Sequence, residues 1–352
     1  MPGIERNHSN APITELLCIG NAMVDVFADV PPYFCKQFGL NAPVQHIGPE
    51  AARAILAVLE EKRPPANASG VLYVSGGGAA NTAKIAARLG VNAAFAGAIG
   101  GPDRFGAIFE EELKRSGVFL HLSRKQSPTG IFISLCPRPE EEPAGNIPQR
   151  VIAAAPSAAL ELDGKDLDEF LFARTRLLMI EGFLLDRTNL VRHILDMADK
   201  YRLTLALDIG TADTAAEYAE LVRSWFGRRP LILFMNEKEA EVFAGTLKYD
   251  SGWESLFTAL SRENPDGNVS IAVKLAERGA AVFSCGEVYH AETEPADAAE
   301  STGAGDAFAA GFLAAWLREE GPRQCGHAGN AAAALVLQSP GTGGGAFPYN
   351  SA

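Results

Sequence analysis

Short apolar runs alternate with longer amphipathic stretches along most of the chain. An apolar run of strand length predicts a strand buried on both faces, and apolar residues three or four positions apart predict a helix. The runs that predict strands are 15–28, 92–100, 175–182, 203–210, 230–236 and 270–276, and the stretches that predict helices include 79–90, 105–118, 189–201 and 237–245. This alternation predicts an α/β fold of three layers, with a mainly parallel central sheet between two layers of helices.

Residues 128 to 160 interrupt the alternation. Two apolar runs there, 129–136 and 149–155, flank a loop rich in Pro and Glu, so they predict two antiparallel strands. With the segment 26–40 they predict a small second sheet outside the main one. Such an insertion is typical of a lid over a binding site, and a hairpin without a function is the alternative. The apolar strand around Ile131 and Phe132 predicts one of two arrangements: it covers the ligand, or, if its apolar face is exposed, it pairs with the lid of a second subunit in a homodimer.

Composition narrows the class of partner. The 352 residues include 43 acidic and 31 basic side chains, and the resulting net charge of −12 argues against nucleic acid and against an anionic membrane surface. Five scattered cysteines without a CxxC pair indicate neither a disulfide framework nor a zinc site. No apolar run reaches membrane-spanning length, and the first residues do not resemble a signal peptide. We therefore expect a soluble, cytoplasmic protein that acts on small molecules.

One short segment combines backbone features with a charged side chain. Gly303, Ala304 and Gly305 stand directly before Asp306, and the apolar residues that follow recur at four-residue steps. We expect a helix to begin at or just after Asp306, so the small residues lie at its N-terminus, where free amides and the helix dipole favour an anion. The simplest alternative is that Asp306 only caps the helix.

An anion site beside a carboxylate suits phosphoryl transfer. In that reaction the protein mainly positions groups and stabilises charge, and an aspartate orients the incoming hydroxyl group and accepts its proton. The sequence lacks GxxxxGK[ST] and lacks GxGxxG after a strand, which argues against a P-loop kinase and a dinucleotide-dependent oxidoreductase.

Residues 300–312, ESTGAGDAFAAGF, resemble the DTTGAGDxFxxG signature of the ribokinase (PfkB) family of sugar and nucleoside kinases. Further segments resemble that family in the same order along the chain: 20–26, 75–90, 97–118, 179–185, 235–245 and 273–283. The resemblance covers roughly Leu16 to Pro348, and the segments 20–26 and 75–83 look closest to the adenosine-kinase-like branch. It implies a ribokinase-like domain over 16–352, a discontinuous β lid at about 26–45 and 116–160, and an N-terminal extension over 1–15.

The resemblance also implies roles for individual residues. Asp306 matches the catalytic base, and Gly303, Ala304 and Gly305 match the anion hole for the transferred phosphoryl group. The positions implied to bind the hydroxyl groups of the acceptor are Asn21, Asp25, Gly76, Gly77 and Asn81. The positions implied to bind the nucleotide are Asn236, Lys274, Glu277, Gly279 and Thr302, and Glu239 is implied to hold Mg²⁺, through water. ATP and Mg²⁺ are thus the expected donor and cofactor.

Three positions depart from the family pattern. Glu300 replaces the usual aspartate, which in the family helps to hold a monovalent cation, so the resemblance supports Mg²⁺ more firmly than K⁺. Lys274 replaces the usual threonine and Ala276 the usual glycine in the nucleotide strand. Lys274 either pairs with a phosphate of the donor or is a solvated strand end.

The expected activity is ATP-dependent transfer of the γ-phosphoryl group to a hydroxymethyl group. An adenosine-like nucleoside is the first expectation for the acceptor, and a free sugar such as ribose or fructose is the alternative. A phosphosugar acceptor would need a basic side chain such as Arg104 or Arg150. The non-enzymatic alternative is a sensing module that has the same fold and binds a sugar or nucleotide without catalysing a reaction.

Overall fold

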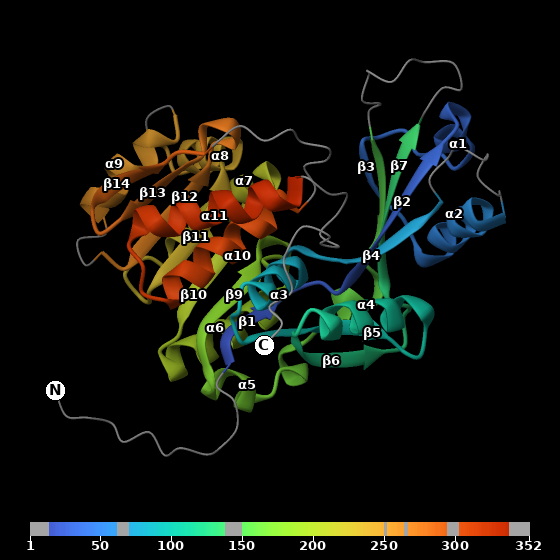
Figure 1. The fold of residues 1–352 in the computed structure, drawn as a ribbon, viewed down its shortest axis with the longest axis horizontal. Coiled ribbons are helices and arrows are strands. Elements are labelled where there is room, and N and C mark those ends of the chain that lie inside the picture. Colours follow the sequence, from blue (N-terminus) through green and yellow to red (C-terminus); the bar gives the residue numbers. More distant parts are fainter. Residues whose placement is uncertain are drawn as a thin grey trace.

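Two β-sheets organise the computed structural model, which describes residues 14–61, 70–137, 150–249, 252–263, 267–293 and 303–337 (Figure 1). Within these residues the large sheet has nine strands in the order β14-β13-β12-β11-β10-β9-β1-β5-β6. All neighbours between β6, at one edge of the sheet, and β12 run parallel. At the other edge β13 pairs antiparallel with β12, and β14 pairs antiparallel with β13. The strands are β1 (Thr14–Ile19), β5 (Ala93–Gly100), β6 (Phe119–Lys125), β9 (Thr175–Glu181), β10 (Thr204–Asp208), β11 (Leu231–Asn236), β12 (Val269–Lys274), β13 (Ala280–Ser284) and β14 (Glu287–Ala291).

Helices cover both faces of this sheet. Successive residues of β1 point to opposite faces: Leu16 and Cys18 enter one apolar core, and Leu17 and Ile19 enter the other. The first core lies under α3 (Gly78–Arg88), α4 (Arg104–Arg115), α10 (Ala304–Leu317) and α11 (Pro322–Leu337). The second lies under α5 (Glu169–Ala173), α6 (Thr188–Tyr201), α7 (Ala212–Arg223), α8 (Glu237–Thr246) and α9 (Glu254–Glu263). The predicted α/β class with a mainly parallel, doubly covered sheet is confirmed.

A smaller sheet projects from the large body (Figure 1). Among the described residues it has five strands in the order β3-β8-β7-β2-β4. They are β2 (Met23–Val30), β3 (Val44–His46), β4 (Leu72–Gly76), β7 (Gly130–Pro137) and β8 (Val151–Ala155). Strands β7 and β8 pair antiparallel and β2 lies beside β7, so the predicted second sheet is confirmed.

The predicted composition of the small sheet was wrong in two places. The segment 116–160 was assigned to it as a whole, but β6 pairs with β5 at the edge of the large sheet. As an edge strand it alternates mostly exposed and half-buried positions, so it lacks the continuous apolar run that marks the inner strands of the large sheet. The second error is that β4 was not included, although it pairs with β2 in the small sheet. Residues 1–13 and 138–149 lie outside the described residues, so the expected N-terminal extension and acidic turn are not described.

One face of the small sheet is packed and the other carries polar residues. Val24 and Val26 of β2 are buried with α1 (Pro32–Gln37) and α2 (Pro49–Glu61), while Asp25 between them is half-buried on the opposite face. Ile131 is buried and Phe132 half-buried, so β7 lacks the exposed apolar face on which the predicted dimer depended. This removes the argument from an exposed strand, and a lid-mediated dimer stays an untested prediction. Among the described helices, none combines the length and apolarity needed to cross a membrane.

Candidate active site

Four adjacent parallel strands of the large sheet end in polar residues that point toward one cavity. The apolar strands β9, β10, β11 and β12 end at Glu181, Asp208, Asn236 and Lys274. Ligands of open parallel sheets bind outside these carboxyl ends. The cavity has a volume of about 290 Å³ and is lined by Gly78, Met179, Glu181, Gly182, Phe183, Asp208, Gly210, Asn236, Glu239, Lys274, Gly305 and Asp306.

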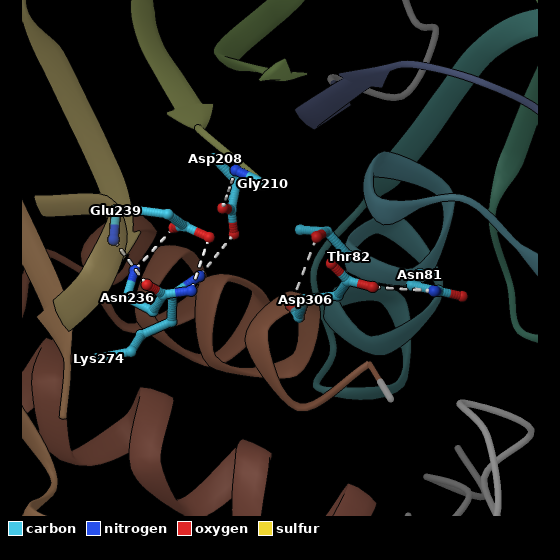
Figure 2. Close-up of polar contacts among 8 residues, drawn as sticks. All are labelled: Asn81, Thr82, Asp208, Gly210, Asn236, Glu239, Lys274 and Asp306. Carbon is cyan, nitrogen blue, oxygen red and sulfur yellow. Dashed lines mark hydrogen bonds and ion pairs between the residues drawn. The ribbon is translucent and has the colours of Figure 1, made fainter. Parts of the chain in front are cut away.

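Asp306 lies in the first turn of α10. The helix begins at Ala304, two residues before the predicted start, because Gly303 adopts a left-handed conformation (φ 81°) and occupies the cap position. Asp306 is therefore not the N-cap. Its Oδ2 accepts a hydrogen bond of 2.9 Å from Asn81 Nδ2, and its carbonyl oxygen accepts one of 3.3 Å from Thr82 Oγ1 (Figure 2). The N-terminal turns of α3 and α10 are thus joined at this carboxylate.

The surroundings of Asp306 favour its protonated form. Burial raises the pKa of its carboxyl group to about 7, and the negative charge of Asp208 adds to this rise, while the hydrogen bond from Asn81 opposes it. A carboxyl group with a pKa near neutrality can both accept and release a proton, which is the property required of a general base at physiological pH.

Lys274 faces the same helix terminus from β12. Its Nζ forms an ion pair of 3.0 Å with Asp208 Oδ2, and the two side chains are only 16% and 12% exposed. A Cβ atom on Gly305 would lie 3.3 Å from this Nζ, so the ammonium group sits against the first turn of α10. Burial lowers the pKa of Lys274, but the charges of Asp208 and Glu239 outweigh it and raise the pKa. A permanent cation therefore borders the predicted anion hole, and a solvated strand end is excluded.

Asn236 and Glu239 close the wall beside Lys274. Asn236 Oδ1 accepts from the Glu239 amide (2.8 Å), and Glu239 accepts in turn from the amide and the side chain of Asn236 (2.8 and 2.7 Å). Glu239 is buried rather than solvated, and burial raises its pKa. Its carboxylate and that of Asp208 both line the cavity (Figure 2). Oxygen donors of this kind suit Mg²⁺, which takes one or two carboxylates and completes its shell with phosphate oxygens and water.

Three glycines run from Asp25 to Asp306 across the end of β4. A Cβ atom on Gly76 would lie 2.3 Å from Asp25 Oδ1, and one on Gly78 would lie 3.2 Å from Asp306 Oδ1. Gly77 has φ 97°, and a Cβ atom there would lie 2.1 Å from the carbonyl oxygen of Asn21. Bare backbone is therefore required between the two carboxylates, as it would be where a ligand approaches closely.

The sequence did not single out Glu181 or Asp208. Glu181 is buried, and its two oxygens accept hydrogen bonds from the amides of Asn21 (2.8 Å) and Ala79 (3.0 Å). Burial raises its pKa, and these two amides oppose the rise. The side chain of Asn21, predicted to bind the acceptor, accepts instead from Arg187 at 2.6 Å. The available signal was a single acidic residue that ends an apolar strand in both cases.

Some predicted positions do not line the cavity. Glu277 is exposed in the short helix η4 (Ala276–Arg278). Gly279 is packed so closely that a Cβ atom would lie 2.1 Å from the carbonyl oxygen of Ala291. Thr302 and Glu300 lie outside the described residues. Arg104 forms an ion pair with Glu60 and stacks on neighbouring aromatic rings, which leaves it engaged away from the cavity.

Ala276 has φ 54°, in the left-handed region that favours glycine. The alanine found where the resemblance expects glycine thus has a backbone conformation that glycine adopts without strain.

Comparisons with known proteins agree with this geometry. Residues 50–348 match the model of the family described as pfkB family carbohydrate kinase. A ribokinase from Arabidopsis thaliana is 25% identical over 274 residues, which cover 76% of this chain and 68% of the ribokinase. The adenosine kinase from Sinorhizobium meliloti superposes with a TM-score of 0.75 at 25% identity, covering 94% of this chain and 96% of that one. A probable sugar kinase from Rhizobium etli CFN 42 superposes with a TM-score of 0.76 at 23% identity, covering 94% of both chains.

Proposed function

Since this chain belongs to the PfkB family and is an ATP-dependent carbohydrate or nucleoside kinase, we propose that its acceptor is a nucleoside, phosphorylated on its primary hydroxyl group. The observation that carries the proposal is the pairing, in one cavity, of the Asp306 carboxylate with an exposed aromatic ring. Phe183 lines the cavity with 52% of its surface exposed, and a Cβ atom on Gly210 would lie 3.5 Å from its ring. A large exposed ring beside a polar site is suited to stacking on a planar base.

Asp306 acts as the general base in this proposal. Asn81 occupies Oδ2, so Oδ1 on the side of Gly78 is left to take the proton of the acceptor hydroxyl group. As that proton moves, the acceptor oxygen bonds to the γ-phosphorus of ATP, and the bond from that phosphorus to the β,γ-bridging oxygen breaks to release ADP. Position 78 is glycine, so no side chain at this position covers Oδ1.

The opposite wall stabilises the phosphate charge. The amides at the start of α10 and the ammonium group of Lys274 face the place where the transferred group would pass, and Gly305 lets it approach. Asp208 and Glu239, with Asn236 as the cap that orients Glu239, would hold Mg²⁺ directly or through water. When bound, Mg²⁺ neutralises phosphate charge and orients the donor.

The acceptor would lie between the small sheet and the large body. Asp25 on β2 and the backbone of Gly76 and Gly77 would bind its hydroxyl groups, and we propose the small sheet as the lid that excludes water. A small-molecule acceptor and ATP are the proposed partners, and the five free cysteines accord with a cytoplasmic location.

The test of the proposed function is ATP consumption by the purified protein with Mg²⁺ over a panel of nucleosides, pentoses, hexoses and hexose phosphates. We expect turnover with a nucleoside that far exceeds turnover with free sugars. Preferred turnover of ribose or fructose would contradict the nucleoside proposal but would agree with kinase activity. If ATP binds but no acceptor reacts, the sensing alternative is favoured.

Truncating Phe183 separates nucleoside from sugar recognition. In Phe183→Ala we expect KM for the nucleoside to rise by about tenfold, since stacking of a base on an aromatic side chain contributes about 1–3 kcal/mol. KM for ATP is expected to stay within about twofold. Initial rates at varied nucleoside and varied ATP measure both constants. An unchanged KM for the nucleoside would show that the ring does not contact it. Phe170→Ala is the matched control, because Phe170 is a similarly exposed ring (58%) on α5, outside the cavity.

The pKa of Asp306 predicts a pH dependence. Only the ionised carboxylate accepts a proton, so kcat/KM is expected to rise about tenfold per pH unit below the pKa of about 7 and to level off above it. The measurement is kcat/KM for the acceptor from pH 5.5 to 9 at saturating ATP and Mg²⁺. A profile flat down to pH 5.5 would mean that this carboxyl group does not limit the reaction.

A further inference from the structure

Lys84 is a fully buried lysine that the mechanism above does not use. It lies on α3, is only 1% exposed, and stands in the sequence between Ala83 and Ile85, which are also buried. Its Nζ donates two hydrogen bonds to one residue, to the carbonyl oxygen of Ser75 at 3.0 Å and to Ser75 Oγ at 2.9 Å. Burying an ammonium group is costly, and a methionine of similar volume would fill the same space without that cost. The contact with Ser75 therefore needs its own explanation.

Ser75 is the point at which the small sheet joins the large body. It pairs with Val24 in the small sheet, and Gly76 after it ends β4 and touches Asp25. The three polar groups of Ser75 form hydrogen bonds with the large body. Its carbonyl oxygen and its hydroxyl group accept from Lys84, and its amide donates to Glu112 of α4 at 2.7 Å. The end of β4 is thus attached to two helices of the large body.

The same helix holds the proposed base. Asn81, less than one turn before Lys84 on α3, donates to Asp306. Helix α3 therefore contacts Asp306 through Asn81 and Thr82, and it contacts the end of β4 through Lys84. Burial lowers the pKa of Lys84 to about 8; Glu112, Asp25 and Asp306 oppose this shift, and Arg88 adds to it. The ammonium group accordingly lies within electrostatic range of both carboxylates that would contact the acceptor.

We propose that Lys84 is a positioning residue for phosphoryl transfer: by holding the end of β4 on helix α3, it sets the acceptor-binding wall of Asp25, Gly76 and Gly77 relative to Asp306. The inference rests on the proposed function, because it concerns the acceptor side of the same site. The inference does not involve the binding of ATP, for which the proposed contacts lie at the ends of β10, β11 and β12. Lys84 touches no substrate and acts through Ser75.

A selective effect on the acceptor follows. In Lys84→Met the carbonyl oxygen of Ser75 loses its donor and the glycine run is free to shift. A displacement of about 1 Å at such a site costs about 100-fold in catalytic efficiency, here kcat/KM for the acceptor. We expect KM for the acceptor to rise by about 10- to 100-fold, with kcat reduced less, because the hydrogen bond of Asn81 to Asp306 is retained. KM for ATP should stay within about twofold.

The experiment compares Lys84→Met with Arg88→Met in the full chain, on whichever acceptor the wild type phosphorylates. Arg88 is the next basic residue of α3, and it donates to Ser116 rather than to Ser75. If Lys84 were merely structural, Lys84→Met would behave like Arg88→Met: the melting temperature would fall, and the ratio of KM for the acceptor to KM for ATP would stay unchanged. That unchanged ratio in Lys84→Met would overturn the proposal.

Ser75→Ala keeps the proposal testable if Lys84→Met does not fold. It removes one of the two acceptors and leaves the lysine in place, so we expect KM for the acceptor to rise about 3- to 10-fold, with KM for ATP unchanged. Equal KM values in wild type and Ser75→Ala, with Lys84→Met unfolded, would also reject the proposal. If the wild type is inactive on the whole panel, the proposed function and this inference are both overturned. If the wild type is active and the ratio of KM for the acceptor to KM for ATP is unchanged in Lys84→Met, only the inference is overturned.

Discussion

Replacing Asp306 by asparagine is expected to lower kcat by about 10³-fold while leaving substrate binding nearly unchanged. Asparagine keeps an oxygen that can accept the hydrogen bond from Asn81, so the junction of α3 and α10 is preserved, but it cannot take a proton. Initial rates give kcat, and calorimetric titration with ATP and with the acceptor tests binding. A kcat within about tenfold of wild type in the folded variant would remove Asp306 from the role of base.

The same variant should gain stability, which separates lost chemistry from lost folding. The pKa of Asp306 is raised from the ordinary value of 3.8 to about 7, so ionising this group destabilises the folded state. This cost is absent below the unfolded pKa, grows as the pH rises from about 4 to about 7, and then stays constant. Melting temperatures should therefore be equal at pH 4 and higher for Asp306→Asn at pH 8. A lower melting temperature at pH 8 would contradict the direction of the shift.

Neutralising Lys274 is expected to have the second largest effect, on the donor side. In Lys274→Met, kcat/KM for ATP should fall by about 10²- to 10³-fold, the loss typical of removing one group that stabilises charge in a transition state. The carboxylates of Asp208 and Glu239 would then face the triphosphate without their cation, which adds repulsion to the loss. KM for the acceptor should change little. Initial rates at varied ATP and fixed Mg²⁺ measure the effect.

Lys125→Met is the matched control for Lys274→Met. Lys125 Nζ pairs with Asp166 Oδ2 at 2.6 Å, and the two side chains are 13% and 12% exposed, close to the values for Lys274 and Asp208. Breaking either pair leaves a mostly buried carboxylate without its cation, so both variants should lose stability. Only Lys274 lines the cavity. Equal losses of activity in the two variants would assign the effect to folding.

The site was predictable where its residues are adjacent in sequence. The segment from Gly303 to Asp306 and the glycine run carry their own signals, because small residues beside a polar side chain leave bare backbone where a ligand can approach. The predicted start of α10 was two residues late because Ala304 and Gly305 have no large apolar side chain to show the helical period, whereas the left-handed Gly303 decides where the helix begins.

Residues that converge from distant strands were harder to predict. Asp208 and Lys274 each end an unremarkable apolar strand, and their contact depends on β10, β11 and β12 lying side by side. No local pattern encodes that adjacency. Lys84 is similar: one lysine in an alanine-rich helix predicts a solvated side chain, and only the tertiary fold buries it against Ser75. The small sheet was found in part because β2, β7 and β8 are apolar, while the short β4 was missed.

The division of the site between two sheets has an evolutionary consequence. The groups facing the phosphates end strands of the large sheet, while Asp25 and the end of β4 belong to the small one. In the proposed function, substitutions in the small sheet would alter how the hydroxyl groups of the acceptor are bound without disturbing the wall proposed to bind ATP. Acceptor preference would then diversify among related kinases through the small sheet and through the ring at Phe183, while the wall proposed for ATP stays under constant selection.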